Sequence, residues 1–296
     1  MASVLITGAS RGIGLATALI LARNGHKVCA TMRDPGRSPQ LRETAEKERL
    51  PITISTMDVD SDASVRETIA SIQKSQGPLD VLVNNAGVEG SGPVEELPLS
   101  EFRRIMETNY FGALRCIQGV LPEMRNRRSG CIINITSVAG RVSSAPMSAY
   151  AASKFALEAL SEGLAQEAKM FNVRVAIVQP GVIDTEMARG LSGRTESASS
   201  PYPQTDRLAA LFAASLQKPT PPTVVGEKIR EIIESGTWKL RHPVGPDAEG
   251  YLQWRASMTD EQWVDWNAAD DDTWYESTQR TFGVDVRAQA ARKRQA

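Results

Sequence analysis

The segment Val4–Gly14, VLITGASRGIG, joins a short apolar run to a glycine-rich turn, and a helical pattern of apolar residues follows at once over Ile13–Arg23. A buried strand that leads through glycines into a helix places backbone N–H groups and the positive helix end where a pyrophosphate can bind. The spacing G-x-x-x-G-x-G, formed by Gly8, Gly12 and Gly14, differs from the dinucleotide fingerprint G-x-G-x-x-G, so a turn made only for packing is the alternative. The order of strand, turn and helix favours a nucleotide site.

Five further apolar runs of strand length follow within the first 190 residues, separated by amphipathic helical patterns. They are Val28–Thr31, Ile52–Met57, Val81–Asn84, Ile132–Ile135 and Val173–Val178. Such alternation predicts an α/β fold, a doubly wound parallel sheet of the Rossmann type. We expect a single domain, with residues 1–190 as dinucleotide-binding and catalytic core and residues 191–296 as substrate lid and C-terminal extension.

Composition narrows the class of protein. The chain has 296 residues, of which 41% are hydrophobic, and a net charge of -1, so it can bury a full core and offers no basic field for nucleic acid or an anionic membrane. Its three cysteines lie apart in apolar runs, and its two histidines are far apart, so we expect free thiols and no metal site. Neither a secretory leader nor a membrane span is expected, which together with free thiols predicts a cytoplasmic protein.

The end of the second predicted strand bears on coenzyme choice. A dinucleotide site commonly has an acid about 20 residues after the glycine turn, where it binds the ribose 2′-hydroxyl. Met32 stands in that place here, and the neighbouring Arg33, together with Arg11, would hold a 2′-phosphate by charge-assisted hydrogen bonds. The sequence therefore predicts NADP, with NAD the less favoured coenzyme. The alternative is an ion pair between Arg33 and Asp34 in solvent.

Polar and small residues follow the third and fourth predicted strands. Asp58 would accept a hydrogen bond from the adenine amino group and Asn85 would contact the ribose, while Ala86 and Gly87 let the coenzyme lie against the backbone. Each polar residue alone is more typical of a turn or a cap. Together they trace a groove along one edge of the sheet.

The helical segment Ser148–Leu164 carries Tyr150 and Lys154, which are four residues apart and share one helix face. A Lys cation about 4 Å from a phenol contributes roughly 4 kcal/mol at an effective dielectric constant near 20, or on the order of three pKa units. The pair therefore predicts a tyrosine whose pKa lies near neutral pH, as acid–base catalysis requires. An ordinary amphipathic helix with an exposed Lys is the alternative.

Seven motifs in this chain resemble those of the short, single-domain branch of the short-chain dehydrogenase/reductase family. They are TGASRGIG at 7–14, DVD at 58–60, NNAG at 84–87, TNYFG at 108–112, NITS at 134–137, YAASK at 150–154 and PGVIDT at 180–185. The resemblance implies a Rossmann-type sheet, hydride transfer to or from a nicotinamide, and a catalytic set that maps onto Asn109, Ser137, Tyr150 and Lys154. In that set Tyr150 moves the proton, Ser137 holds the substrate oxygen, Lys154 assists both phenol and ribose, and Asn109 holds a relay water.

The residues expected to bind the coenzyme come from five of the seven motifs, all except the fourth and the fifth, and from Arg33 at the end of the second predicted strand. They are Gly8, Ser10, Arg11, Gly12, Ile13, Gly14, Arg33, Asp58, Val59, Asn85, Ala86, Gly87, Tyr150, Lys154, Pro180, Gly181, Ile183 and Thr185. The last four would surround the nicotinamide, with the Ile183 backbone and the Thr185 hydroxyl next to its carboxamide.

Beyond the core we expect a mobile connection that becomes a lid, two helices, a last strand and an aromatic tail. The corresponding residues are Gly190–Tyr202, Arg207–Leu216, Pro221–Ile233 and Trp238–Val244, followed by Trp254, Trp263, Trp266 and Trp274. Thr259 and Gln262 predict a capping box for a short helix. The tryptophans would close the substrate pocket, dock onto another subunit or pack on the chain's own core, and the sequence leaves these alternatives open. Arg287–Arg294 is expected to be a frayed basic end, with an anionic-surface contact as the alternative.

These features predict an NADP(H)-dependent oxidoreductase for a secondary alcohol or ketone. Leu191, Leu208, Leu211 and Phe212 in the lid favour an apolar, medium-sized substrate, and the helix from Tyr150 somewhat resembles that of 17β-hydroxysteroid and retinol dehydrogenases. The alternative is a redox sensor or scaffold with the same fold, although such a protein has no need of the Ser-Tyr-Lys set. The resemblance also implies a homodimer or homotetramer, formed through the helices Ser100–Met124 and Tyr150–Met170.

Overall fold

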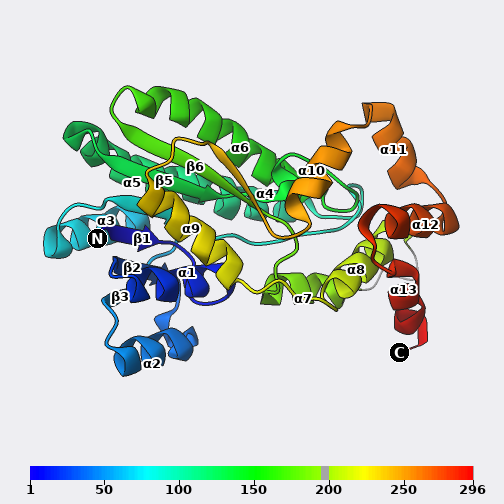
Figure 1. The fold of residues 1–296 in the computed structure, drawn as a ribbon, viewed down its shortest axis with the longest axis horizontal. Helices are drawn as coiled ribbons and strands as arrows, with labels where there is room; N and C mark the ends of the chain where they lie inside the picture. Colours follow the sequence, from blue (N-terminus) through cyan, green and yellow to red (C-terminus); the bar gives the residue numbers. More distant parts are fainter. Residues whose placement is uncertain (195–199, 296) are drawn as a thin grey trace.

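A computed structural model describes residues 1–194 and 200–295 and shows a seven-stranded parallel sheet (Figure 1). The strands are β1 (Ser3–Ile6), β2 (Lys27–Met32), β3 (Ile52–Thr56), β4 (Val81–Asn84), β5 (Gly130–Ile135), β6 (Val173–Pro180) and β7 (Arg241–Val244). Their order across the sheet is β3-β2-β1-β4-β5-β6-β7, and every neighbouring pair is parallel. The chain reverses its direction of winding between β1 and β4, which is where open α/β sheets bind ligands. The predicted doubly wound fold is confirmed.

Seven helices flank the sheet in the described part of the chain. They are α1 (Gly12–Arg23), α2 (Pro39–Glu48), α3 (Asp62–Gln76), α4 (Leu99–Met106), α5 (Gly112–Arg127), α6 (Ser148–Lys169) and α9 (Thr223–Ser235). Single turns, η1 (Pro35–Arg37), η2 (Glu107–Phe111) and η3 (Val138–Gly140), stand next to α2, between α4 and α5, and before α6. The remaining helices are α7 (Glu186–Ser192), α8 (Gln204–Ser215), α10 (Ala248–Ala256), α11 (Asp260–Ala268), α12 (Asp271–Phe282) and α13 (Val286–Gln295).

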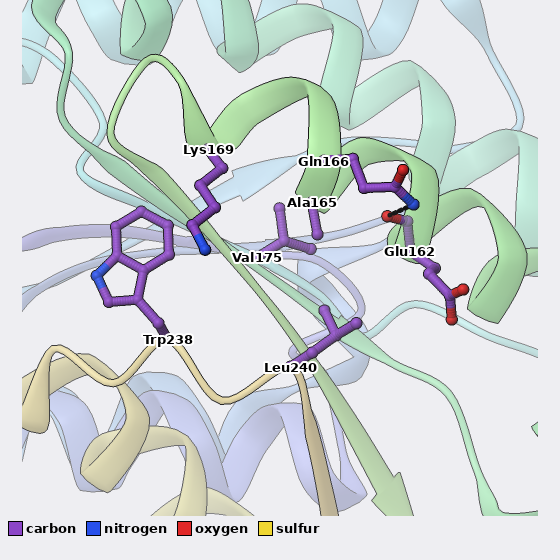
Figure 2. Close-up of a pocket in the computed structure, with 7 residues that line it drawn as sticks. All are labelled: Glu162, Ala165, Gln166, Lys169, Val175, Trp238 and Leu240. Atoms are coloured by element: carbon purple, nitrogen blue, oxygen red, sulfur yellow. Dashed lines mark hydrogen bonds between the residues drawn. The ribbon is translucent and has the colours of Figure 1, made fainter.

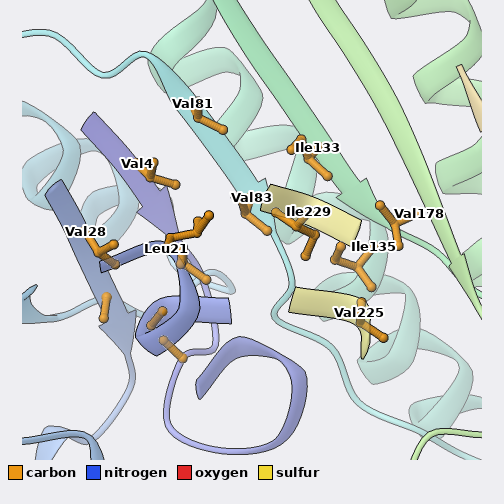
Figure 3. Close-up of a cluster of buried hydrophobic side chains, with 14 of the residues drawn as sticks. Val4, Leu21, Val28, Val81, Val83, Ile133, Ile135, Val178, Val225 and Ile229 are labelled. Carbon is orange, nitrogen blue, oxygen red and sulfur yellow. The ribbon is translucent and has the colours of Figure 1, made fainter. Parts of the chain in front are cut away.

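The central strands are mostly apolar because both faces of the sheet are covered. Val4 and Ile6 point to the face covered by α1 and α9, where Val225 and Ile229 complete the core shown in Figure 3. Leu5 points the other way, into a second core with α3, α5 and α6. Successive side chains of a strand alternate between faces, so a strand buried on both sides reads as a nearly continuous apolar run, and a buried polar residue such as Asn134 is hydrogen-bonded.

The sheet also uses chain from beyond residue 190. Helix α9 packs on α1, and β7 pairs with β6 through Ile177 and Arg241. A division at residue 190 therefore does not coincide with the end of the sheet. Gly190 is part of α7 and not of an irregular connection, while residues 195–199 of the expected lid lie outside the described residues. Among the helices that the structure describes, none has the length and apolar character required to cross a bilayer.

Helices α10–α13 form a unit beside the sheet, next to α8 (Figure 1). Its rings contact one another in a chain: Trp254 lies 5.5 Å from Trp263 and 5.0 Å from Trp266, measured between ring centroids. Helix α13 packs on α8 with Val286 buried, so the expectation of a frayed end for Arg287–Arg294 is wrong. Apolar residues on one face of this helix give it a partner that the basic composition of the segment conceals.

A buried arginine joins α8 to this C-terminal unit. Only 4% of Arg207 is exposed; its Nε donates to Asp271 Oδ1 at 2.8 Å and its Nη2 to the carbonyl of Ala269 at 2.8 Å. The guanidinium also lies 5.6 Å from the centre of the Trp274 ring. The predicted capping box of Thr259 and Gln262 is present at the start of α11. The lid helix and the aromatic tail therefore form one structural unit.

Candidate active site

The glycine turn packs closely on the loop that follows β4. Gly8 and Gly12 have φ angles of +65° and +55°, in the left-handed region that favours glycine. A Cβ atom on Gly8 would lie 2.7 Å from Ala86 Cα, and one on Gly14 would lie 2.5 Å from Asn85 Nδ2. Gly8 and Gly14 therefore leave no room for a side chain, so close packing, the alternative explanation for these glycines, accounts for part of the motif.

The N-terminus of α1 nonetheless has the features of an anion site. Arg11 is the N-cap residue, and within the described chain no side chain caps this helix and its first turn holds no acid. The N–H groups of Gly12, Ile13 and Gly14 belong to the first turn, where a helix has no internal acceptor for them. These donors and the helix dipole fit a pyrophosphate.

The side chain of Asn85 stabilises the glycine turn. Its Nδ2 donates to the carbonyl oxygens of Thr7 at 2.9 Å and Gly8 at 3.0 Å, and its backbone N–H donates to Thr7 Oγ1. Both amide hydrogens are therefore engaged, so the predicted contact of Asn85 with a ribose would have to use another atom of this residue. The side chain instead fixes the distance between β1 and β4 at the edge where the coenzyme is expected.

The arginines expected at the adenosine end have different surroundings. Arg11 pairs with Glu186 at the start of α7, whereas Arg33 is exposed at the end of β2. Asp34 accepts a hydrogen bond from the Gly36 N–H at 2.9 Å and thereby caps η1, in place of the alternative ion pair with Arg33. Asp58 Oδ1 accepts from the Asp60 N–H at 3.1 Å, as turn residues do.

Ser137, Tyr150 and Lys154 meet at the carboxyl ends of β5 and β6. The Tyr150 hydroxyl is hydrogen-bonded to the Ser137 side chain, and Ser137 Oγ lies 3.4 Å from the Pro180 carbonyl oxygen. Lys154 Nζ donates to the carbonyl of Ile135 at 2.9 Å and lies 5.7 Å from the centre of the Tyr150 ring. Tyr150 and Lys154 are 9% and 5% exposed, so the alternative of an exposed lysine on an ordinary amphipathic helix does not hold.

Asn109 lies in the π-helical turn η2, between α4 and α5. Its Oδ1 accepts from the Val88 N–H at 2.8 Å, and its Nδ2 donates to the Val88 carbonyl and to Ser153 Oγ, both at 2.9 Å. The side chain therefore ties the loop after β4 to α6. Gly87 fits against this amide, because a Cβ there would lie 3.3 Å from Asn109 Oδ1 and 3.8 Å from Lys154 Nζ. A π-turn changes the helical hydrogen-bond pattern, which leaves the backbone as the part of Asn109 that could hold a water.

The expected acidity of Tyr150 is wrong for this chain. Burial raises the pKa of Tyr150 to about 12, the hydrogen bond from Ser137 opposes this, and the negative charge of Glu89 adds to it. Burial also lowers the pKa of Lys154 to about 8. Desolvation is the largest cause of both pKa shifts, and the ammonium donates to the Ile135 carbonyl while lying 5.7 Å from the centre of the Tyr150 ring.

Two acidic residues next to the site were missed by sequence reasoning. Asp247 Oδ2 accepts from the Val182 N–H at 2.8 Å and so holds the loop after β6. Glu89 binds Arg194 at 2.8 Å and thereby links the loop after β4 to the end of α7. The turn sequence Gly245-Pro246-Asp247 was a local signal for the first, whereas Glu89 had none beyond its place two residues after NNAG.

The aromatic tail contacts the segment that connects Ser137 to Tyr150. Trp263 Nε1 donates to the carbonyl of Ser143 at 2.9 Å, and the Tyr251 hydroxyl shares a hydrogen bond of 2.9 Å with Ser144 Oγ. The tryptophans thus pack on one another and on this loop. Of the three alternatives for the tail, the structure supports packing within the chain, at a position that borders the predicted catalytic residues.

A surface hollow of about 200 Å³ lies elsewhere, on the outer side of α6 (Figure 2). Trp238 and Leu240, which precede β7, line it opposite α6, and Lys169 Nζ lies 5.9 Å from the centre of the Trp238 ring. Glu162 is also at its rim. None of the predicted catalytic residues lines this hollow, so it is separate from the candidate active site.

The burial of Lys154 predicts how the free energy of unfolding depends on pH. The folded chain binds the lysine proton more weakly than the unfolded chain, so folding is penalised at neutral pH and wild-type stability rises with pH between about 8 and 10.5. Lys154→Met is expected to increase the free energy of unfolding at pH 7 by up to about 3 kcal/mol, and this advantage is expected to shrink towards pH 10.5. Urea unfolding over this pH range measures it. Lys169→Met, an exposed lysine on the same helix, is the control, and a pH-independent advantage would contradict the prediction.

Comparison with known proteins places this geometry in a family. A family profile described as short chain dehydrogenase matches residues 2–195. Retinol dehydrogenase 8 of Bos taurus is 42% identical over 212 residues, which are 70% of this chain and 67% of that protein. The 3-ketodihydrosphingosine reductase of Bacteroides thetaiotaomicron is 35% identical over 248 residues, 82% of this chain and 87% of that one.

A solved structure agrees with these sequences. The short-chain dehydrogenase from Streptomyces avermitilis superimposes with a TM-score of 0.75 at 32% identity, over 90% of this chain and 96% of that one. The matched profile contains the glycine turn together with Ser137, Tyr150 and Lys154. The chain therefore belongs to the short-chain dehydrogenase/reductase family and is an NAD(P)-dependent oxidoreductase that acts on CH–OH groups.

Proposed function

We propose that the protein transfers a hydride between NADP(H) and a secondary alcohol or ketone of apolar character and medium size. The observation that carries this proposal is the hydrogen bond between Tyr150 and Ser137, formed next to Lys154 at the same sheet edge as the open N-terminus of α1. Two hydroxyl groups and an ammonium group converge where a carbonyl oxygen gains negative charge during reduction.

The bound nicotinamide would supply or accept the hydride. In reduction, Ser137 holds the substrate oxygen while Tyr150 donates its proton to that oxygen; oxidation reverses the transfer. A phenol whose pKa is raised to about 12 stays protonated at neutral pH, which is the form that donates. Lys154, with a pKa near 8, keeps most of its positive charge at pH 7 and stabilises the developing anion. Asn109 would hold a relay water through its backbone.

NADP is the proposed coenzyme because of Arg33. Its guanidinium is exposed at the carboxyl end of β2, Asp34 is engaged in capping η1, and Arg11 pairs with Glu186. Arg33 is thus the better placed of the two arginines for a 2′-phosphate, and Arg11 would have to exchange partners to assist it. Charge-assisted bonds from a guanidinium to a phosphate provide the selectivity over NAD.

The apolar substrate is supported by the relatives and by the lid unit. The two relatives compared above are named for retinol and for 3-ketodihydrosphingosine, and a hydroxyl or keto group on a largely apolar molecule is common to both names. In the chain itself Leu211 of α8 packs on the C-terminal apolar cluster. The apolar side of α8 would therefore contact both the substrate and the tail. The loop held by Trp263 and Tyr251 is then the wall of the substrate site.

The proposal also covers the oligomeric state of the protein and its cellular compartment. Phe111 and Phe155 are each 42% exposed, on η2 and α6, which supports the homodimer or homotetramer implied by the family resemblance. Three buried free cysteines support a reducing compartment such as the cytoplasm. A sensor or scaffold role is the less favoured alternative because the catalytic set is complete.

Tyr150→Phe removes the proton donor while keeping the ring. We expect kcat for ketone reduction to fall by about 10²–10⁴-fold, because general acid catalysis by a placed side chain contributes this much. The dissociation constant of NADPH should change little, which fluorescence titration measures. Substantial turnover in this variant would place the acid on another residue.

Arg33→Ala is expected to lower the ratio of kcat/KM with NADPH to kcat/KM with NADH by roughly 10-fold to 100-fold, the equivalent of one charge-assisted hydrogen bond. Steady-state kinetics with both coenzymes gives the ratio. Arg42→Ala, at an exposed arginine of α2, is the matched control. An unchanged ratio in the Arg33 variant would remove the assignment of NADP to this residue.

Trp263→Phe keeps an aromatic ring, although a smaller one, and loses the hydrogen bond to the Ser143 carbonyl, while Tyr251→Phe loses the one to Ser144. Each is expected to raise KM for apolar ketones about threefold to tenfold through a looser substrate wall, with a smaller effect on kcat. Trp266→Phe is the control, because its Nε1 donates to Ser277 Oγ inside the tail. Equal effects in all three variants would indicate a general loss of tail packing.

A further inference from the structure

Glu158 is a buried acid on the catalytic face of α6. It follows Tyr150 by eight residues and Lys154 by four, so the three side chains lie one helical turn apart along one face. Only 4% of Glu158 is exposed. Acidic residues are rarely buried to this extent unless they are paired, so the contacts of this carboxylate define its role.

Three donors from three strand ends converge on this carboxylate. Its Oε1 accepts from Thr136 Oγ1 at 2.9 Å and from Gln179 Nε2 at 2.9 Å. Its Oε2 accepts from Arg241 Nε at 2.9 Å, at the start of β7. Gln179 Nε2 and Arg241 Nε carry the hydrogens of their bonds, so Glu158 accepts from both, whereas the single hydroxyl hydrogen of Thr136 is shared with the Val178 carbonyl oxygen 3.1 Å away.

The donors are direct neighbours of the catalytic edge. Thr136 precedes Ser137, and Gln179 precedes Pro180, whose carbonyl oxygen lies 3.4 Å from Ser137 Oγ. The turn η3 after Ser137 also rests on this side chain, because a Cβ on Gly140 would lie 2.9 Å from Glu158 Cγ. The carboxylate therefore contacts the segments on both sides of the reacting hydroxyl.

We propose that Glu158 is a positioning residue for the reaction: its carboxylate holds the ends of β5 and β6 at the separation that aims Ser137 at the substrate oxygen. This inference rests on the role proposed above for Ser137. Displacement of a reacting group by about 1 Å can cost on the order of 10²-fold in rate, so a shared anchor for both strand ends has a direct effect on turnover.

The charge of Glu158 matters because of Arg241. The guanidinium of Arg241 bridges Glu158 to Glu162, which is on the outer surface of α6. Hydrogen bonds between ionised partners are about twice as strong as neutral ones. Glu158→Gln preserves the size of the side chain but presents an amide NH₂ group or a weaker acceptor to Arg241, and so loosens the anchor without opening a cavity.

The test compares four proteins with NADPH and an accepted ketone. Glu158→Gln is expected to lower kcat about 10-fold to 100-fold while KM for the ketone and the NADPH dissociation constant stay within about threefold, since misplacement of a reacting group acts on the chemical step. The double variant Glu158→Gln with Arg241→Gln should recover most of the loss, because two amides can pair. Glu162→Gln, which touches the same arginine from the surface, should leave kcat unchanged.

A second measurement does not depend on turnover. The Gly140 N–H donates to the Ser137 carbonyl and the Gly181 N–H to the Val244 carbonyl, each at 2.9 Å. Hydrogen exchange at both amides should be about tenfold faster in Glu158→Gln and unchanged in Glu162→Gln, since exchange reports local opening. Unchanged exchange, or a kcat equal to that of the wild type, overturns the role of Glu158. If the wild type reduces no ketone while exchange responds as expected, the proposed substrate class fails and the anchor stands.

Discussion

The active edge of this protein depends on keeping a lysine ammonium out of water. Lys154 is 5% exposed, and its Nζ donates a hydrogen bond to the carbonyl of Ile135, at the end of β5. Desolvation lowers its pKa to about 8 and raises that of Tyr150 to about 12. Simple attraction between the two groups has the opposite sign, and it loses because both are buried. In this structure the phenol stays neutral at pH 7, which is the form that can donate a proton to a substrate oxygen.

Residues at strand ends could be predicted from the sequence because the fold makes their position follow from their pattern. Thr7–Gly14, Asn85 and Ser137 each follow an apolar run, and parallel strands bring such ends to one edge. Side-chain partners could not be predicted in the same way. Asn85 gives both amide hydrogens to the glycine turn, and Asn109 bridges the Val88 backbone and Ser153, because these contacts depend on the separation of β1, β4 and α6.

The region beyond residue 190 was harder to predict for a different reason. Helix α9 and strand β7 have local patterns and appear near the expected residues, but the basic composition of α13 conceals the burial of Val286 and Ala290. The tryptophans carry no period that distinguishes a subunit interface from an internal core. What decides their role is the partner of each polar ring atom: Trp263 donates to Ser143, next to the catalytic residues, and Trp266 donates within the tail.

One helix face thus carries three polar side chains that do different work at three depths. Tyr150 is hydrogen-bonded to Ser137, Lys154 binds the end of β5, and Glu158 binds residues at the ends of β5 and β6 and at the start of β7. A buried carboxylate is costly unless its acceptor sites are filled, and here three donors fill them. The same bonds that offset the burial of Glu158 also fix the strand ends on either side of Ser137. Side chains four residues apart share one face of a helix, so the spacing of Tyr150, Lys154 and Glu158 turns all three towards the same edge of the sheet.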